Sequence, residues 1–221
     1  MDKPLALDID GTITTPDGRI DPRAASELHK WDGPIVLATG MAFPYPVVLC
    51  RFLGIPEIAV AENGGIVYVE DEVFTEGSRE IAWDVIDEYR ECGGTTDWKR
   101  ESSINRWRET EAVVSPNADE ELLRSIADDY NVDVVFTGYA YHIKKSGLNK
   151  GLGLQNACEI MNLKPESFVA VGDSANDVEM FEIVGKSFAV GNSDEAARKA
   201  ADTVLEDEFM HGTLSVLREI I

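Results

Sequence analysis

Residues 5–12 read LALDIDGT, a short apolar run that stops at a pair of acids and a glycine. Four later runs have the same form, at residues 34–38 before Thr-Gly, 58–61 before Glu-Asn, 168–171 before Gly-Asp and 187–190 before Gly-Asn. Short apolar runs without polar alternation are typical of strands buried on both faces, as in a parallel sheet covered by helices. The helix-like segments that separate these runs lie at 22–31, 43–53, 149–161, 176–184 and 194–201. The alternation predicts a doubly wound α/β domain with a parallel sheet.

The middle of the chain follows a different pattern. It predicts a helix at 79–91, strands near 102–108 and 111–115, a helix at 118–130, and strands near 132–136 and 139–145. The order α-β-β-α-β-β with hairpin-length turns indicates a small α+β unit inserted into the larger domain. We therefore predict a core made of residues 1–76 and 149–221, and an inserted domain of residues 77–148.

The amino-acid composition limits the kinds of molecule that this protein can bind. Of the 221 residues, 44% are hydrophobic and 28% are charged, which excludes a disordered chain. Acids outnumber bases by 41 to 20, for a net charge of −21. Such a surface repels nucleic-acid backbones and anionic lipid, so we expect no nucleic-acid partner and no membrane partner. The excess of acid also fits a protein from a high-salt habitat, where ions screen the carboxylates.

Cysteine use and the N-terminal sequence bear on location. Cys50, Cys92 and Cys158 are an odd number without a C-x-x-C pair, so they predict neither a disulfide framework nor a zinc site. Residues 1–11 contain no basic segment followed by a long apolar stretch, and no run approaches 18 apolar residues. We therefore expect a cytoplasmic protein. The sequence leaves its oligomeric state open, a homodimer included.

The polar residues that follow the apolar runs form the candidate site. In open α/β sheets, ligands bind beyond the carboxyl ends of the strands. Asp8 and Asp10 are two apart and project to one side of an extended chain, whereas Asp173 and Asp177 are four apart across a turn into a helix. Four carboxylates around one point cannot all ionise without a cation, and Mg²⁺ prefers oxygen ligands. The spacing therefore predicts a Mg²⁺ site formed by these four aspartates.

Each candidate also has a purely structural interpretation. A single aspartate at a strand end can form a turn or cap a helix, as Asp17 does in an Asp-Gly pair. Lys150 is also compatible with an exposed lysine at the start of a helix, and Asn176 with either a helix cap or a donor to phosphate. Asn63 and Asn192, which also end apolar runs, are expected to form turns.

Four segments together resemble the haloacid dehalogenase superfamily of phosphatases. DIDGT at 8–12 is similar to the first motif of that family, Thr39 within VLATG to the second, Lys150 within LNKG to the third, and GDSANDVEMF at 172–181 to the fourth. They occur in the family's order and span nearly the whole chain. The resemblance implies a Mg²⁺-dependent phosphatase with a Rossmann-like core, and it implies that the insert is a cap of the type called C2B.

The resemblance also assigns roles to single residues. It implies that Asp8 is the nucleophile and forms an aspartyl-phosphate, while Asp10 acts first as general acid and then as base. It further implies that Asp8, the backbone carbonyl of Asp10 and Asp173 hold Mg²⁺, with Asp177 beside them. The residues expected around the phosphoryl group are Thr39, Gly40, Lys150 and Asn176.

The cap is expected to contact the leaving group and so to decide specificity. In the predicted strand at 139–145, Tyr139 and Tyr141 share a face with Ile143, and this aromatic face is the better candidate for the core of the cap. The cations that could meet an anionic leaving group are His142 and Lys144 on the other face, and Arg106 and Arg108 on the neighbouring strand. The alternative is that all four are solvated surface charges.

The short cap and the chain length are most similar to family members that hydrolyse 2-phosphoglycolate to glycolate and phosphate. A sugar phosphate or mannosyl-3-phosphoglycerate is the alternative substrate. A phosphotransferase like the phosphomannomutases and a non-catalytic binding module are the alternative functions. We therefore expect a small phosphorylated metabolite as the partner.

Overall fold

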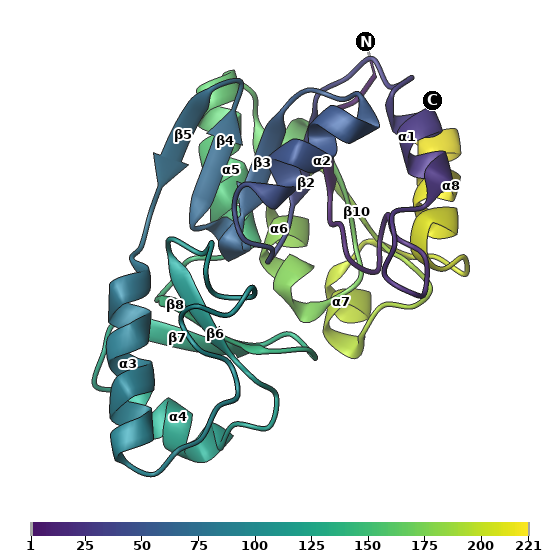
Figure 1. Cartoon of the computed structure of the whole chain (residues 1–221). Helices are drawn as coiled ribbons and strands as arrows, with labels where there is room; N and C mark the ends of the chain where they lie inside the picture. Colours follow the sequence, from purple (N-terminus) through teal and green to yellow (C-terminus); the bar gives the residue numbers. More distant parts are fainter. Residues whose placement is uncertain (1, 221) are drawn as a thin grey trace.

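Two sheets organise the computed structural model, which describes residues 2–220 (Figure 1). The larger sheet has eight strands in the order β11-β10-β9-β1-β2-β3-β4-β5. Its parallel strands are β1 (Leu5–Leu7), β2 (Ile35–Ala38), β3 (Ile58–Ala61), β9 (Val169–Gly172), β10 (Lys186–Ala189) and β11 (Thr203–Val204). An antiparallel hairpin of β4 (Ile66–Val69) and β5 (Glu72–Thr75) extends one edge. The predicted parallel α/β sheet is confirmed, and the hairpin is an addition to it.

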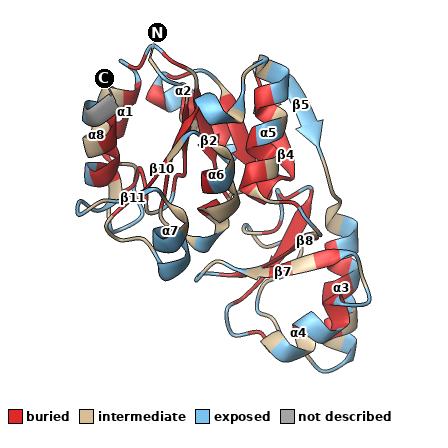
Figure 2. Cartoon of the chain, turned by 180° about the vertical axis from the view of Figure 1, so that it is seen from behind, coloured by how far each residue is buried: buried red, intermediate tan, exposed pale blue. Residues whose placement is uncertain are grey.

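Helices cover both faces of this sheet. They are α1 (Pro22–Leu28), α2 (Tyr45–Leu53), α5 (Lys150–Met161), α6 (Val178–Ile183), α7 (Glu195–Ala200) and α8 (Phe209–Ile220). Successive residues of a strand point to opposite faces, so Leu5 and Leu7 pack in a cluster with α1, α2 and α8. Ala6, between them, packs in a second cluster with α5, α6 and α7. Figure 2 shows these inner surfaces buried, which confirms the doubly wound arrangement.

The central strand β1 marks a change of direction in the sheet. From β1 the order continues to β2 and β3 on one side, while β9 and β10 lie on the other. In parallel sheets such a switch point opens a crevice beyond the carboxyl ends of the strands. The residues that follow β1, β2, β3 and β9 are Asp8, Thr39, Glu62 and Asp173. The topology therefore brings chemically useful side chains to one edge of the sheet.

A smaller unit lies beside that edge (Figure 1). Its elements are α3 (Arg79–Glu91), β6 (Glu111–Val114), α4 (Glu120–Ala127), β7 (Val132–Phe136) and β8 (Tyr141–Lys145), with the antiparallel strands in the order β6-β8-β7. Tyr141 and Ile143 of β8 pack against α3 and α4, whereas His142 and Lys144 occupy the opposite face. This unit falls within the predicted insert, whose boundaries at 77 and 148 stay a prediction.

The predicted strand at 102–108 is wrong, because residues 101–107 form turns. Asn105 donates from Nδ2 to the carbonyl of Val113 over 2.9 Å and accepts at Oδ1 from the Val113 amide over 2.8 Å. This side chain therefore occupies the backbone groups of β6 with which a neighbouring strand would pair. Of the two predicted strands before α4, only β6 forms, so the smaller sheet has three strands.

The hairpin of β4 and β5 was missing from the predicted elements for a local reason. Its turn residues, Glu70 and Asp71, have φ angles of 45° and 78°. Two-residue hairpin turns with positive φ favour Asn and Gly, so a Glu-Asp pair gives no hairpin signal. The short edge strand β11 and the last helix α8 were also not predicted.

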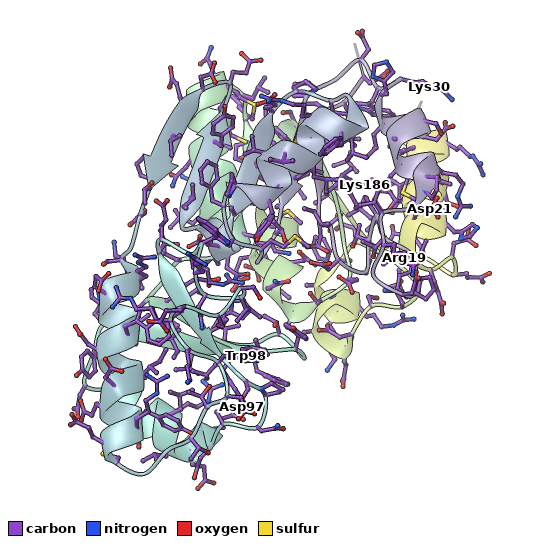
Figure 3. All side chains as sticks on the ribbon, in the orientation of Figure 1. Arg19, Asp21, Lys30, Asp97, Trp98 and Lys186 are labelled. Atoms are coloured by element: carbon purple, nitrogen blue, oxygen red, sulfur yellow. The ribbon has the colours of Figure 1, made fainter. Side chains whose placement is uncertain are left out.

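Side-chain caps fix the starts of α1 and α5. Asp21, labelled in Figure 3, accepts from the Arg23 amide over 2.8 Å at the start of α1. Asn149 accepts from the Leu152 amide over 2.8 Å at the start of α5, which places Lys150 in the first position of that helix. In the part of the chain that the structure describes, no helix has the length and apolar content needed to cross a membrane.

Candidate active site

A cavity of about 700 Å³ lies between the carboxyl edge of the larger sheet and the smaller unit. Six of the eight predicted site residues line it, namely Asp8, Asp10, Thr39, Gly40, Asp173 and Asn176. Residues of the smaller unit that line it include Ser103, Ile104, Arg108, Tyr139 and His142. The remaining two predicted residues, Lys150 and Asp177, are fully buried next to the cavity wall. The fold therefore gathers all eight at one place.

Asp8 has two oxygens in different environments. Oδ1 accepts a hydrogen bond from Lys150 Nζ over 2.5 Å, and the same ammonium donates to Asp177 Oδ1 over 2.7 Å. Among the residues that the structure describes, none makes a hydrogen bond with Oδ2 of Asp8. Among the described residues, Thr12 Oγ1 is the only buried side-chain polar atom without a partner. Oδ2 of Asp8 is thus not enclosed, and it is open to the cavity that this residue lines.

The charges around Asp8 do not balance. Burial raises the pKa of Asp8 well above its ordinary range; Lys150 opposes this shift, while Asp177 and Asp173 add to it. Burial, reinforced by Asp177, likewise raises the pKa of Asp173 to about 7. Burial by itself would lower the pKa of Lys150, but Asp177 and Asp8 outweigh it and raise that pKa. One ammonium group faces three carboxylates, so a bound cation would relieve the repulsion.

These three aspartates form a cluster that could hold a metal ion. Carboxylate oxygens of Asp8, Asp173 and Asp177 lie within 4.8 Å of one another. Asp177 is already occupied, because Oδ2 accepts from the amides of Asp173 (2.9 Å) and Ser174 (3.1 Å) and Oδ1 accepts from Lys150. Oxygen donors of this kind fit a hard divalent cation. The oxygens left for it belong mainly to Asp8 and Asp173.

Asp10 lies beside this cluster and lines the same cavity. Its side chain is exposed to the cavity and makes no hydrogen bond or ion pair with any described residue. Although solvent reaches Asp10, the surrounding protein removes part of its hydration, and this burial raises its pKa against the opposing effect of Lys150. An unpaired carboxyl with a raised pKa is suited to give and take a proton.

Thr39 and Gly40, which follow the neighbouring strand β2, also line the cavity. Thr39 Oγ1 accepts from the Met41 amide over 3.0 Å, which leaves the hydroxyl proton for another acceptor. The carbonyl of Gly40 accepts from Arg108 Nη1 over 2.9 Å and so joins this loop to the smaller unit. A β carbon at position 40 would come within 3.1 Å of Asn63 Oδ1, which explains why glycine suits this close approach.

Asn176 does not cap the helix that follows it. The capping box at that point is formed by Ser174 and Asp177. Asn176 instead lines the cavity, where its Nδ2 donates to Asn63 Oδ1 over 3.2 Å and its Oδ1 accepts from Ser174 Oγ over 2.7 Å. Of the two roles left open by the sequence, its position favours a polar contact within the site.

The predicted site residues did not include Glu62 and Asn63, which help to join the larger unit to the smaller one. Glu62, fully buried after β3, accepts from the amides of Glu109 (3.0 Å) and Thr110 (2.8 Å) and from Thr110 Oγ1 (2.7 Å). Asn63, expected only as a turn residue, donates from Nδ2 to Glu111 Oε2 over 3.1 Å. The available signal was their place after a buried strand, at the same edge as the aspartates.

Two of the four candidate cations of the smaller unit reach the cavity. Arg108 and His142 line it and are almost completely buried. Lys144 instead donates to the carbonyl of Leu148 and lines a different hollow, and Arg106 is exposed on the surface. The prediction that Tyr139 belongs to the core of this unit is wrong. It is 65% exposed, lines the cavity and contacts the ring of Trp98, which Figure 3 labels.

Known proteins share this sequence and fold. The chain matches the haloacid dehalogenase-like hydrolase family over residues 5–91 and 95–217. It is 50% identical to the phosphoglycolate phosphatase of Halorubrum lacusprofundi, covering 100% of this chain and 98% of that protein. It is 49% identical to the phosphoglycolate phosphatase of Natronomonas pharaonis, covering 98% and 97%. With the protein of that name from Methanococcoides burtonii the identity is 34%, covering 97% and 95%.

Solved structures agree on the fold. A crystal structure of a Thermoplasma acidophilum protein superposes with a TM-score of 0.85 at 24% identity, covering 100% of this chain and 98% of that one. A haloacid dehalogenase-like hydrolase from Bacteroides thetaiotaomicron gives a TM-score of 0.78 at 21% identity, covering 100% of both chains. At these identities the likeness concerns the arrangement of the elements alone.

Proposed function

The chain belongs to the haloacid dehalogenase-like hydrolase family, and within that family we propose that it is a Mg²⁺-dependent phosphatase that hydrolyses 2-phosphoglycolate to glycolate and phosphate. Relatives that carry the name phosphoglycolate phosphatase match it from end to end at up to 50% identity. The cavity also suits a small ester with two anionic groups, since it joins the acidic cluster that would hold a cation to Arg108 and His142 of the smaller unit.

One observation carries the proposal: Asp8 keeps one carboxylate oxygen open to the cavity, while Asp10, beside it, has no hydrogen-bond or ion-pair partner among residues 2–220. In the first step Asp8 Oδ2 attacks the phosphorus, the bond from phosphorus to the ester oxygen breaks, and Asp10 gives its proton to the departing glycolate oxygen. A carboxylate nucleophile divides the hydrolysis into two easier steps. Lys150 holds the other oxygen of Asp8 and so fixes the direction of attack.

The second step returns the enzyme to its starting state. Asp10, now ionised, takes a proton from a water molecule whose oxygen attacks the phosphorus. The bond between phosphorus and Asp8 then breaks and phosphate leaves. No described residue makes a hydrogen bond with Asp10 that would hold it in one protonation state, which suits a group that changes state twice in each cycle. Thr39, with its hydroxyl proton uncommitted, is placed to donate to a phosphoryl oxygen.

Asp8 and Asp173 are the side chains that would hold Mg²⁺, together with the backbone carbonyl that the family resemblance assigns to Asp10. Asp177 supports them, since it holds the Asp173 amide and the Lys150 ammonium in place. When bound, Mg²⁺ neutralises charge between the nucleophile and the phosphoryl oxygens. Its binding would also satisfy the carboxylates that are now crowded around one ammonium group.

The test is a substrate panel in high KCl, with Mg²⁺ or with EDTA. We expect phosphate release from 2-phosphoglycolate with the highest kcat/KM of the panel, and loss of release in EDTA. The panel includes hexose phosphates and mannosyl-3-phosphoglycerate, each without any sugar acceptor. An equal or higher kcat/KM on either alternative would overturn the choice of substrate. Absence of phosphate release without an acceptor would instead indicate a phosphotransferase.

A further inference from the structure

The cavity wall opposite the aspartates holds a buried ionic cluster. Glu111 is completely buried, and its Oε1 accepts from Arg108 Nη1 and contacts His142 Nδ1 at 3.0 Å. Its Oε2 accepts from Asn63 Nδ2 over 3.1 Å. Burial would raise the pKa of Glu111, but His142 and Arg108 outweigh it and lower that pKa to about 2. One ionised carboxylate therefore orients two basic side chains at the same time.

Each of these basic side chains keeps a donor group free. Arg108 donates from Nε to the carbonyl of Ile104 over 2.9 Å and from Nη1 to Gly40 and Glu111. Its Nη2, like His142 Nε2, has no hydrogen-bond partner within residues 2–220. Neither nitrogen is among the enclosed unpaired atoms of that range, so both are accessible, and both residues line the cavity.

We propose that Arg108 Nη2 and His142 Nε2 bind the carboxylate of the leaving group, with Glu111 as the positioning residue for both. We call these two donor nitrogens the carboxylate clamp. The inference rests on the proposed function, because it assigns the carboxylate of glycolate to this clamp. Arg108 uses Nε and Nη1 on protein acceptors and keeps Nη2 accessible at the cavity that it lines, so a carboxylate oxygen can accept a charge-assisted hydrogen bond from Nη2.

The spacing of the two ends supports a small substrate. Arg108 is joined by one hydrogen bond to the carbonyl of Gly40, and Gly40 follows Thr39 on the phosphoryl side. The clamp and the phosphoryl position are thus separated by little more than one loop. The proposal requires that a two-carbon ester reaches from one to the other. The phosphoryl group cannot occupy the clamp in the productive orientation, because it must lie at Asp8.

The hydrogen bonds of His142 agree with a donor at Nε2. If Nδ1 accepts from Asn63, over 3.1 Å, the neutral ring carries its proton on Nε2. If Nδ1 donates to Glu111 and the ring is protonated, both nitrogens carry protons. In both states Nε2–H points a donor toward an anion. An incoming carboxylate disfavours the third state, in which Nε2 is an acceptor.

The experiment compares 2-phosphoglycolate with 2-phosphoglycolamide, in which a neutral amide of similar shape replaces the carboxylate. Turnover of p-nitrophenyl phosphate reports the phosphatase activity that does not depend on the leaving group's carboxylate. We expect the wild type to prefer the acid by about 100-fold in kcat/KM, because a buried charged donor left without its acceptor is unfavourable. Arg108→Met should reduce this preference to about tenfold or less, mainly through KM for the acid. Glu111→Gln should reduce it by a smaller factor. The matched control is Arg106→Met, an exposed arginine two positions away, which should keep the wild-type preference.

The possible outcomes distinguish failure of the clamp proposal from failure of the proposed function. Equal turnover of acid and amide by the wild type would overturn the clamp and leave a phosphatase. Turnover of p-nitrophenyl phosphate but not of 2-phosphoglycolate would overturn the proposed function, and the clamp with it. An equal loss on both isosteres in Arg108→Met would show that the residue only holds the fold. If that variant fails to fold, Arg108→Lys and His142→Asn give the same comparison with smaller changes in packing, and an unchanged preference in both would contradict the clamp.

Discussion

At the scale of single residues, Asp8 divides its carboxylate between structure and chemistry. Lys150 holds Oδ1, and Oδ2 is open to the cavity. In Asp8→Asn the amide oxygen can still accept from Lys150, so the fold should survive. The amide nitrogen is no nucleophile, and we expect kcat for 2-phosphoglycolate to fall by about 10⁴-fold or more. The measurement is the initial rate of phosphate release at saturating substrate.

The control for this substitution is Asp17→Asn. Asp17 lies in an exposed turn and accepts from Thr15 Oγ1, away from the cavity. It should keep wild-type turnover, and circular dichroism should show both variants folded. A kcat in Asp8→Asn within tenfold of the wild type would contradict the assignment of the nucleophile.

The grouping of site residues that follow buried strands could be predicted from the sequence. The contacts that side chains make between the two units could not. Asp8 and Asp173 follow apolar runs, and a parallel sheet brings such positions to one edge, so the sequence was enough to group them. Glu111 is the first residue of a strand and, in the sequence, looks like an ordinary polar position on one face. Its contacts with Arg108 and His142 depend on how the strands pair and how the units meet, which no local pattern contains.

At the scale of elements, Glu62 fixes the junction between β3 and the segment that leads into β6. Its carboxylate accepts two backbone amides and one hydroxyl from Glu109 and Thr110. Glu62→Gln replaces one acceptor oxygen with a donor that faces other donors. We expect the free energy of unfolding to fall by about 2 kcal/mol. Amide exchange at Glu109 and Thr110 should become faster, as measured by hydrogen exchange with mass spectrometry or NMR.

A matched substitution tests whether that effect is local. Glu72→Gln makes the same chemical change on the exposed strand β5 and should alter neither stability nor exchange at the junction. Unchanged exchange at Glu109 and Thr110 in Glu62→Gln would show that the junction is held by other contacts.

The pairing of β6 with β8 should make stability depend on pH in the acid range. Ionised Glu111 faces Arg108, His142 and Lys144, with Glu62 as the neighbouring acid. Its pKa is about 2 in the folded protein and near 4.5 when free of these partners. A depressed pKa means that the contribution of Glu111 is complete above about pH 4.5 and is lost as the pH falls toward 2.

We therefore expect the unfolding free energy of the wild type to decrease more steeply between pH 4.5 and pH 2 than that of Glu111→Gln. Urea titrations across this range measure the two slopes. Glu121→Gln, an exposed position on α4, is the control and should keep the wild-type slope. Parallel curves for the wild type and Glu111→Gln would contradict the depressed pKa.

Helices and strands could be predicted where a local sequence pattern alone determines the structure. The apolar runs found five of the parallel strands because these strands are buried on both faces. The prediction of a strand at 102–108 was wrong because the side chain of Asn105 binds the backbone groups of Val113 with which such a strand would pair. The hairpin turn at Glu70 and Asp71 was not predicted because its two residues have positive φ angles but are not the Asn and Gly that signal such a turn.

At the scale of the whole molecule, the net charge of −21 is spread over both units. Residues 77–149 hold 15 acids and 9 bases, and the rest of the chain holds 26 acids and 11 bases. The excess of acids gives a net repulsion across the surface, and folding brings these charges closer together. Salt reduces the cost, since the screening length falls from about 10 Å at 0.1 M to about 3 Å at 1 M.

We accordingly expect the melting temperature to rise by about 5 °C or more between roughly 0.1 M and 2 M KCl. Calorimetry in EDTA measures this rise without divalent cations at the aspartate cluster. Asp173→Asn, which removes one carboxylate of that cluster, should show the same dependence on salt if the effect comes from the whole surface. Sucrose at equal osmolality separates screening from the general exclusion of solutes. A melting temperature that does not change with KCl, or that rises equally in sucrose, would mean that repulsion among the surface acids does not limit the stability of this protein.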